Sequence, residues 1–290
     1  MTTTQTLIKA FGLLFVMGNS LGIGLRLPVG HMLAEHFRNW QLAARVLLIN
    51  FVILSGLIIG YAKLVDIPAN IKIGYCIVAL AAGAPFAPML TGLAKGDVPL
   101  STTLFVVLTV GTVVVVPFAL SPAVSWVAPD VARISIWQMA WPLLVFLMLP
   151  LVIGCALRLR YPAAQHGERA LQLISLTCLL LYANVFIVSN WNSFTDAWGT
   201  GTYGAAVAVP ILGVALGRLV SRTDDVGAKR ASVITTTQRS ISGAIVVTLY
   251  SYPQTDANVA VTIINTIGIT ILLLLSLEWG RASARKQSPA

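Results

Sequence analysis

Charged residues are scarce in this sequence. Asp, Glu, Lys and Arg make up 10% of its 290 residues, whereas a soluble domain carries about 25%. No charged residue occurs within five stretches, at 73–94, 98–129, 134–157, 170–195 and 197–217. Each stretch reaches the roughly 20 residues that a helix needs to cross about 30 Å of hydrocarbon. The scarcity excludes a chain built mainly of soluble domains and predicts an all-α polytopic membrane protein.

Cysteine and histidine are also rare, with three residues of each type. The cysteines lie within apolar blocks, at Cys76, Cys155 and Cys178. They lack CxxC spacing, which argues against a disulfide framework or a structural metal site, so we expect them to pack in the core. The histidines lie outside these blocks, at His31, His36 and His166. A buried metal cluster or a histidine proton relay is therefore not expected.

The apolar blocks predict nine transmembrane helices. Their approximate ranges are 6–25, 41–62, 70–94, 98–119, 135–157, 170–189, 199–219, 229–250 and 257–278. The first block is not typical of a signal peptide, because residues 2–6 contain no basic residue and Asn19 and Ser20 interrupt its apolar run. We therefore expect it to be a helix of the mature protein.

The distribution of Lys and Arg predicts the orientation of these helices. Four basic residues fall on the side of the N-terminus and fourteen on the side of the C-terminus, leaving Arg239 inside a span. Because basic residues mark the cytoplasmic side, we expect the N-terminus outside and the C-terminus in the cytoplasm of a cell (inner) membrane. Anchoring to the bilayer also accounts for the net charge of +9 without a nucleic-acid partner.

The third block contains the sequence GAPFAPML at residues 83–90. Pro85 and Pro88 each remove a backbone donor, and Gly83 adds conformational freedom beside them. We expect two half-helices joined by an unwound link, since irregular backbone at membrane depth is tolerated where it faces protein or water. The alternative is a kinked helix packed on a neighbour.

The eighth block contains the sequence VITTTQRSISGAIVV at residues 233–247. If this helix begins near Lys229, Arg239 lies ten residues inside it, which is about 15 Å deep. A charge so far from both helix ends predicts a functional site that faces protein or water.

A weak internal repeat links the two interrupted blocks. LTVGTVVVV (108–116) follows the third block and NTIGITILL (265–273) follows the eighth. The two copies would run in opposite directions across the membrane. Interrupted segments at matching positions of inverted repeats indicate the binding site of a secondary transporter.

The chain resembles the bile acid:sodium symporter family. The clearest stretch is TGLAKGDVPLSTTLFVVLTVGTVVVVPF at 91–118, which is similar to the family signature YLAKGDVALS. TTQRSISGAIVV occupies the place of the family's second broken helix, whose usual form is E-x-x-x-Q-N-S-G. The nine-span layout also matches, and the resemblance covers nearly the whole chain.

The resemblance implies a core domain with two crossing discontinuous helices, and a panel domain beside it. The core would comprise about 39–120 and 198–280, and the panel about 1–30 and 130–190. An organic anion would bind in the crevice between them. Panel residues expected to line the crevice are Asn19, Trp137, Trp141, Tyr182 and Asn184.

Several positions depart from the family pattern of sodium ligands. The Ser-Asn pair of the first break is replaced by Ala87 and Pro88, and the acidic position of the second break is Ile234. Arg239 stands in place of the family's Asn. Ser101 keeps a family hydroxyl, but the position four residues later is Phe105. The resemblance therefore implies that both sodium sites are degraded.

These departures suggest that Arg239 supplies a fixed positive charge where relatives place a mobile cation. A guanidinium stays protonated at accessible pH and can hold a carboxylate or sulfonate with two hydrogen bonds. We predict a secondary active transporter that carries a small organic anion by alternating access, with sodium coupling weakened or lost. The expected substrate-binding residues are Arg239, Gln238, Ser240, Thr237, Thr236, Pro85, Phe86, Asn19 and Asn184.

Two other interpretations remain open, and three are disfavoured. Arg239 could instead bond carbonyls freed at the crossing. Sodium symport could persist through backbone carbonyls and a set of side chains; the candidate ion ligands are Ser101, Thr102, Thr235, Gln238 and Thr266. A sodium ion belongs to this alternative alone, and no cofactor is expected. A channel lacks the required continuous polar face, and an enzyme lacks intramembrane His or carboxylate groups. The related arsenite carriers have a Cys at the first break, whereas this chain has Phe86, which argues against metalloid transport.

Overall fold

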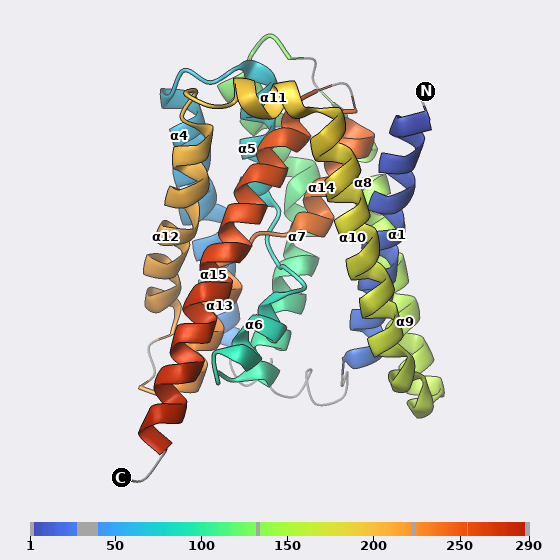
Figure 1. The fold of residues 1–290 in the computed structure, drawn as a ribbon, viewed down its shortest axis with the longest axis vertical. Helices are drawn as coiled ribbons and strands as arrows, with labels where there is room; N and C mark the ends of the chain where they lie inside the picture. The colour runs from blue at the N-terminus through green and yellow to red at the C-terminus, as the bar shows by residue number, and fades with distance from the viewer. Residues whose placement is uncertain (1–2, 28–39, 132–133, 222–223, 254, 288–290) are drawn as a thin grey trace.

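The computed structural model describes residues 3–27, 40–131, 134–221, 224–253 and 255–287. Within these ranges the chain is helical, and most helices run roughly along the long axis of the molecule (Figure 1). Seven helical segments in the described ranges are long and apolar enough to cross a membrane. The chain is therefore a polytopic helical membrane protein, as the composition predicts.

Four of the seven segments are single α-helices, and a fifth begins with a short 3₁₀ turn. They are α1 (Thr3–Arg26), α7 (Val98–Val127), α12 (Thr202–Val220) and α15 (Ala257–Gln287). The segment Pro162–Ser189 consists of the 3₁₀ turn η3 (Pro162–Gly167) and α10 (Glu168–Ser189), and the short α11 (Trp191–Asp196) follows it. His166 lies in η3, whereas His31 and His36 fall outside the described residues.

The other two long segments each contain six residues of π-helix. In the first, α3 (Trp40–Leu48) continues through η1 (Ile49–Leu54) into α4 (Ser55–Leu64). In the second, α8 (Ile136–Pro142) continues through η2 (Leu143–Met148) into α9 (Leu149–Arg160). Such bulges occur frequently at functional sites because they change the direction of side chains within a helix.

The remaining two apolar blocks are divided. The first forms α5 (Ala69–Leu80) and α6 (Ala87–Leu93), joined by residues 81–86, here named the first link. The second forms α13 (Val226–Thr237) and α14 (Ile241–Ser251), joined by residues 238–240, the second link. The 12 residues of α5 extend about 18 Å, too short to cross the hydrocarbon alone. The nine-span topology and the inverted repeats stay predictions.

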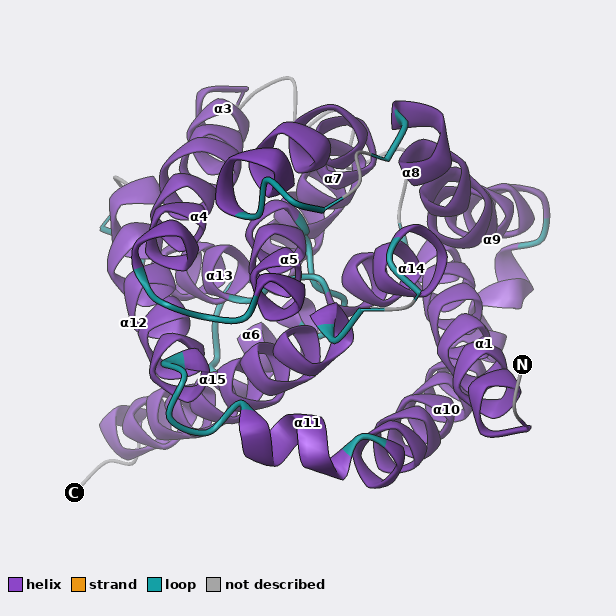
Figure 2. Cartoon of the chain, turned by 90° about the horizontal axis from the view of Figure 1, so that it is seen from above, coloured by secondary structure: helices purple, strands orange, loops and turns teal. Residues whose placement is uncertain are grey.

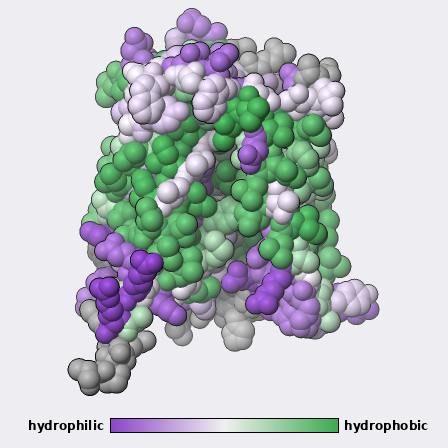
Figure 3. Space-filling model, viewed as in Figure 1, coloured by the Kyte–Doolittle hydropathy of each residue, from purple (hydrophilic) through white to green (hydrophobic). Residues whose placement is uncertain are grey.

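Hydrophobic side chains cover the middle of the molecule. Figure 3 shows a broad hydrophobic band with hydrophilic residues gathered at its two ends. Leu173, Val188 and Ile211 are among the large apolar side chains left exposed on this surface. An apolar surface of this extent suits lipid as the surrounding solvent.

The first link begins earlier than the prolines alone predict. Helix α5 ends at Leu80, and Gly83 adopts a φ of +76°, a conformation that favours glycine. A Cβ atom at Gly83 would lie 2.6 Å from the Thr109 nitrogen, so the position also lacks space. The prediction that Pro88 helps to break the helix is wrong. Pro88 lies in the first turn of α6, where a missing N–H is harmless.

The second link forms without a proline. Three consecutive threonines, Thr235 to Thr237, end α13, and β-branched residues are stiff and weak helix formers. Ser240 restarts the helix as the N-cap of α14, where its side chain accepts a hydrogen bond from the Gly243 N–H at 3.2 Å. The polar run predicted as an interruption is thus helical up to Thr237.

Helices from the expected panel ranges pack mainly on one another. Helix α1 makes its most extensive contacts with α10 and α9. On the other side, α12 packs against α13 and α15, and α5 packs against α7 and α15. Figure 2 shows these two groups side by side when the molecule is viewed from above. Helix α14 contacts α1, α8 and η2 as well as α15 and therefore lies between the groups.

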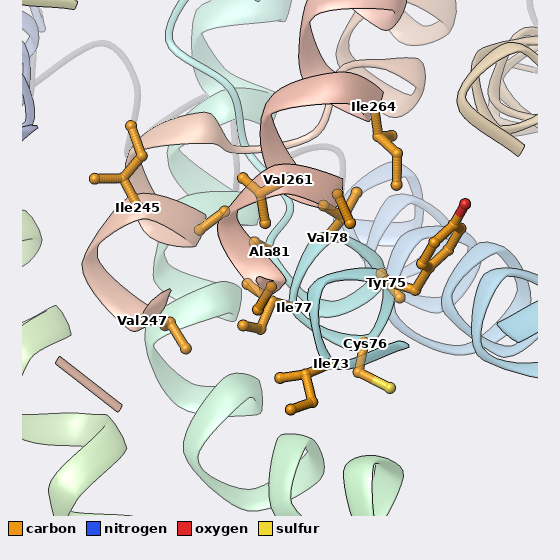
Figure 4. Close-up of a cluster of buried hydrophobic side chains, with 14 of the residues drawn as sticks. Ile73, Tyr75, Cys76, Ile77, Val78, Ala81, Ile245, Val247, Val261 and Ile264 are labelled. Carbon is orange, nitrogen blue, oxygen red and sulfur yellow. The ribbon is translucent and has the colours of Figure 1, made fainter. Parts of the chain in front are cut away.

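The hydrophobic core lies around α5. Figure 4 shows Ile73, Ile77 and Val78 of α5 in one buried cluster with Ile245 of α14 and Val261 of α15. The same cluster contains Cys76, which is fully buried, and Cys178 of α10; Cys155 is half-buried, and all three thiols are free. This packing surrounds the first half-helix with apolar side chains and fixes the position at which it ends.

Candidate functional site

The two links pair with each other in antiparallel fashion. Ala82 and Arg239 form an isolated β-bridge, and the Ser240 N–H donates to the Ala81 carbonyl at 2.9 Å. Thr112 of α7 supports the first link, because its Oγ1 accepts from the Ala82 N–H at 2.9 Å and donates to the Ala82 carbonyl at 2.8 Å. Backbone groups that leave the two helices therefore find partners in the interior.

The Arg239 guanidinium binds the end of α5. Its Nε donates to the Val78 carbonyl at 3.0 Å, its Nη2 donates to the Ala79 carbonyl, and its Nη1 donates to Asn50 Oδ1 at 3.0 Å. The last carbonyls of a helix lack partners within it and carry its negative end. Arg239 is 4% exposed, so its charge is stabilised by these three oxygen atoms rather than by water.

Asn50 reaches Arg239 from the π-helical segment η1. The Asn50 side chain is fully buried, and its Nδ2 donates to the Val46 carbonyl at 2.9 Å, which leaves Oδ1 to accept from the guanidinium. Ser55 lies one turn further along and contacts both the Asn50 carbonyl, at 2.7 Å, and the Ala79 carbonyl. Neither residue was predicted from the sequence, although each is a polar interruption in the apolar range 41–62.

Three buried hydroxyl groups lie together beside α6 and α7. Thr91 Oγ1 donates to the Ala87 carbonyl at 2.8 Å and lies 3.0 Å from Ser101 Oγ, which lies 2.9 Å from Thr235 Oγ1. The structure thus brings together two of the candidate ion ligands, Ser101 and Thr235. In the structure each hydroxyl has a protein partner.

The ion-ligand candidate Gln238 and the predicted substrate residue Thr236 each have an oxygen atom without a partner among the described residues. Thr236 Oγ1 and Gln238 Oε1 are buried and accept no hydrogen bond among the described residues. Thr102 is different, because its hydroxyl donates to the Val98 carbonyl of its own helix at 2.9 Å. Thr266 is exposed on α15 and is not brought to the links, whereas its neighbour Asn265 lines a small pocket with Gln238.

A narrow crevice separates the links from the panel helices. Asn19 and Ser20 of α1 line one side, and Gly83, Pro85 and Ser240 line the other. Ser242 of α14 also lines it, and its hydroxyl has no partner among the described residues. The cavity is about 10 Å³, which is close to the smallest space that holds one water molecule. The crevice is therefore closed in this conformation.

The predicted substrate residues do not form one group. Ser240, Pro85 and Asn19 line the crevice, whereas Thr237, Gln238 and Arg239 line a separate small pocket beside α12 and α15. Thr236 is buried in α13, and Phe86 is half-buried against the core. Asn184 is exposed on α10, and its Nδ2 donates to the Leu180 carbonyl of the same helix, so the expectation that it faces the crevice is not met.

The aromatic panel residues also require correction. Trp137 and Trp141 of α8 are 66% and 51% exposed, and their rings lie tilted to each other with centroids 6.3 Å apart. Tyr182 of α10 is buried, but its hydroxyl accepts from Asn258 Nδ2 of α15 rather than lining the crevice. Their positions follow from which face of each helix is turned inward, a property that a uniformly apolar helix does not show in its sequence.

The electrostatics of the links have two sources. The Arg239 charge lies at the carboxyl end of α5, where it offsets the negative pole of that helix. Helix α14 begins at Ile241 and directs its positive pole toward the crevice, where Ser240 and Ser242 line the wall. An anion in the crevice would meet the helix end and the two serine hydroxyls, with Arg239 behind them.

Interrupted helices that pair at their breaks within an apolar bundle are typical of secondary transporters. The model of the Sodium Bile acid symporter family matches residues 10–197, about two thirds of the chain. The chain belongs to this family, which is a family of membrane transporters. The matched region includes most of α1 and the first link and ends before α12, so the second link lies beyond it. No curated protein sequence matches the chain.

Proposed function

We propose that the protein carries a small organic anion across a cell membrane by alternating access, with Arg239 as an internal cation that replaces a coupling sodium ion. The N-terminus would lie outside and the C-terminus in the cytoplasm, as the basic residues predict. The helices of the panel ranges would move against the remaining helices, which would hold the two links. The observation that carries the proposal is the ligand set of the Arg239 guanidinium.

The guanidinium is surrounded as a bound cation would be. Two backbone carbonyls, of Val78 and Ala79, and the amide oxygen of Asn50 point their negative ends at it. Oxygen atoms of these types are the ligands that hard metal cations take from proteins. A covalently attached charge in this position removes the need to bind a sodium ion before the anion.

Arg239 itself is not the anion's contact residue in this proposal. Three of its five N–H groups already donate to oxygen atoms of the protein, and the side chain is 4% exposed, which leaves little of it open to a substrate carboxylate. Of the two roles considered from the sequence, the contacts support the bonding of freed carbonyls. The anion would instead occupy the crevice, near Asn19, Ser240 and Ser242.

The decisive experiment measures uptake into proteoliposomes with sodium replaced by choline. Cholate, taurocholate and pyruvate, each radiolabelled, serve as probes after a thermal-shift screen of carboxylates and sulfonates. We expect equal uptake rates of the accepted anion in the two salts. A rate that falls at least tenfold in choline contradicts the internal-cation proposal, and no uptake of any probed anion contradicts the transport proposal.

A paired variant sharpens this test. Ile234→Glu with Arg239→Asn restores the acidic residue and the Asn that the family pattern places at these positions. We expect sodium-dependent uptake in the double variant and little uptake by Arg239→Asn alone, because the single variant has neither the fixed charge nor the acidic ligand. The control is Arg218→Asn, which changes an exposed arginine of α12.

Sodium symport is the second candidate function. The buried Thr236 Oγ1 and Gln238 Oε1 favour it, because neither has a hydrogen-bond partner among the described residues and a cation needs oxygen ligands of this kind. Under this candidate, uptake by the unmodified protein depends on sodium, and Gln238→Leu raises the sodium concentration needed for half-maximal uptake. The choline experiment therefore separates the two candidates.

A further inference from the structure

A second, larger cavity lies between the panel helices and the rest of the molecule. It has a volume of about 710 Å³, within the range of ligand pockets, and is formed by α1, α10, α14 and the start of α15. Figure 2 shows α1 and α10 next to each other with α14 beside them, and Figure 1 places the N-terminus at this end. We name it the N-face cavity.

Lys9 is the cationic residue of the N-face cavity. It lies in α1, two turns from the helix start, and is half-buried. None of the described residues forms a hydrogen bond or an ion pair with its ammonium group. A half-buried ammonium without a protein acceptor is available to an anionic ligand.

The carboxylate of the N-face cavity, Asp256, has a structural role of its own. Asp256 directly precedes α15, where the positive pole of the helix stabilises a carboxylate. Ser193 Oγ of α11 also donates to Asp256 Oδ1 at 3.2 Å. These groups stabilise the Asp256 carboxylate in its place, and Lys9 supplies the positive charge that attracts an anionic ligand.

The rest of the wall combines apolar and hydrogen-bonding groups. Ile8, Phe186 and Leu249 supply apolar surface, while Ser189 and Thr248 supply hydroxyl groups. Such a lining suits an amphipathic body attached to a single anionic group.

Below the N-face cavity, the path toward the crevice is closed. Asn258 Nδ2 of α15 donates to the Tyr182 hydroxyl of α10, and Thr248 Oγ1 lies 3.3 Å from Asn258 Oδ1. Along α1 the next close approach is at Gly12, where an added Cβ would lie 3.1 Å from Leu249 Cδ1 and 3.3 Å from Ile245 Cγ2. Asn19 of the crevice follows seven residues later, about 10 Å further along the helix.

We propose that the N-face cavity is a binding site for an amphipathic organic anion, with Lys9 holding its carboxylate or sulfonate before the anion enters the crevice. Only the second step of this inference, the passage of the anion from the N-face cavity into the crevice, rests on the proposed transport function. The binding step requires an open cavity and an unpaired ammonium, and can be measured without transport.

The test measures binding of dansylglycine to the full-length protein in phosphatidylcholine nanodiscs by fluorescence. Dansylamide, which lacks the carboxylate, is the neutral probe. We expect saturable binding of dansylglycine, a dissociation constant about tenfold higher in Lys9→Gln, and recovery in Lys9→Arg. Dansylamide should not distinguish the variants. Lys72→Gln, which removes a cation of α5 outside the cavity, is the matched control and should bind as the unmodified protein does.

Two results overturn the proposal. One is the absence of saturable binding, or equal dissociation constants for the unmodified protein and Lys9→Gln with unchanged thermal unfolding. The other is evidence that the ligand is a lipid phosphate, which carries a negative charge as the carboxylate or sulfonate of an organic anion does. If phosphatidylglycerol added to the nanodiscs weakens dansylglycine binding to the unmodified protein but not to Lys9→Gln, the site belongs to a lipid headgroup.

Transport measurements then separate this inference from the proposed function. Anion uptake with a Michaelis constant unchanged by Lys9→Gln contradicts the role of the N-face cavity and leaves the carrier function intact. Lys9-dependent binding without any uptake contradicts the carrier function and leaves the binding site intact.

Discussion

Arg239 Nη1 and Asn50 Oδ1 are joined by a buried hydrogen bond of 3.0 Å across 189 positions of the sequence. The bond connects the second link to the π-helical segment η1, and the same guanidinium closes the carboxyl end of α5. One side chain thereby holds three elements of the interior together. Its removal should affect the fold as well as transport.

Replacing Arg239 with Ala should destabilise the protein strongly. The change leaves the carbonyls of Val78 and Ala79 and the amide oxygen of Asn50 without their buried donor, which should lower the free energy of unfolding by about 3 kcal/mol. Arg239→Lys should lose less, because it keeps the charge but not the planar fork. Chemical denaturation in mixed micelles measures both. Equal stability of Arg239→Ala and the exposed-site control Arg218→Ala would show that the three bonds contribute little.

The acceptor role of Asn50 can be tested separately. Asn50→Leu leaves a charged donor unpaired in the interior and should cost about 1–3 kcal/mol of unfolding free energy. Asn50→Asp keeps an acceptor at the same place and should cost less than Asn50→Leu. The reverse order of stability would contradict the observed bond to the guanidinium.

Thr112 should matter more than Thr102 for the stability of the first link. Thr112→Val keeps the side-chain shape but removes the hydrogen-bond partner of the Ala82 N–H and carbonyl. It should lower the free energy of unfolding by about 1–3 kcal/mol. Thr102→Val removes only a bond to the carbonyl of Val98 in the same helix and should be close to neutral. Thermal unfolding of the pair in detergent tests the difference, and similar melting temperatures would mean that the Ala82 groups find other partners.

Glycine is required at position 83. Gly83→Ala combines a positive φ with a Cβ that meets the Thr109 backbone. It should lower the yield of folded protein, or lower the free energy of unfolding by about 1–3 kcal/mol. Gly60→Ala in α4 is the control, since nothing lies within 4 Å of its added Cβ and alanine favours the helix by up to about 1 kcal/mol. Gel-filtration yield and thermal unfolding measure both variants. A normal yield for Gly83→Ala would indicate that the first link can relax.

The breaks were predictable to within a few residues because their causes are local. Gly83 and Pro85 lie in the first link, between α5 and α6, and the threonine run and Ser240 frame the second link. The exact limits were not predictable, since Pro88 is tolerated in the first turn of α6 and Arg239 leaves its helix to pair with Ala82.

The positions of the predicted site residues followed from the sequence only in part. Asn19 and Ser240, two predicted substrate residues, line the crevice, whereas Asn184 and Thr266 are exposed. In a helix whose lipid face and core face are both apolar, the sequence carries little periodic signal to show which face a polar residue occupies. Asn265, next to Thr266, is the residue that faces the links.

The sequence by itself determined the solvent of this protein, the approximate limits of its apolar helices and the sites of their interruption. Those properties follow from local composition: charge-free stretches match the thickness of a bilayer, and glycine, proline and polar runs end helices. Only the tertiary structure decided what Arg239 binds and where a ligand could enter. Val78, Ala79 and Asn50 reach it through packing of segments far apart in the chain, and Lys9 becomes significant because four helices enclose a cavity around it.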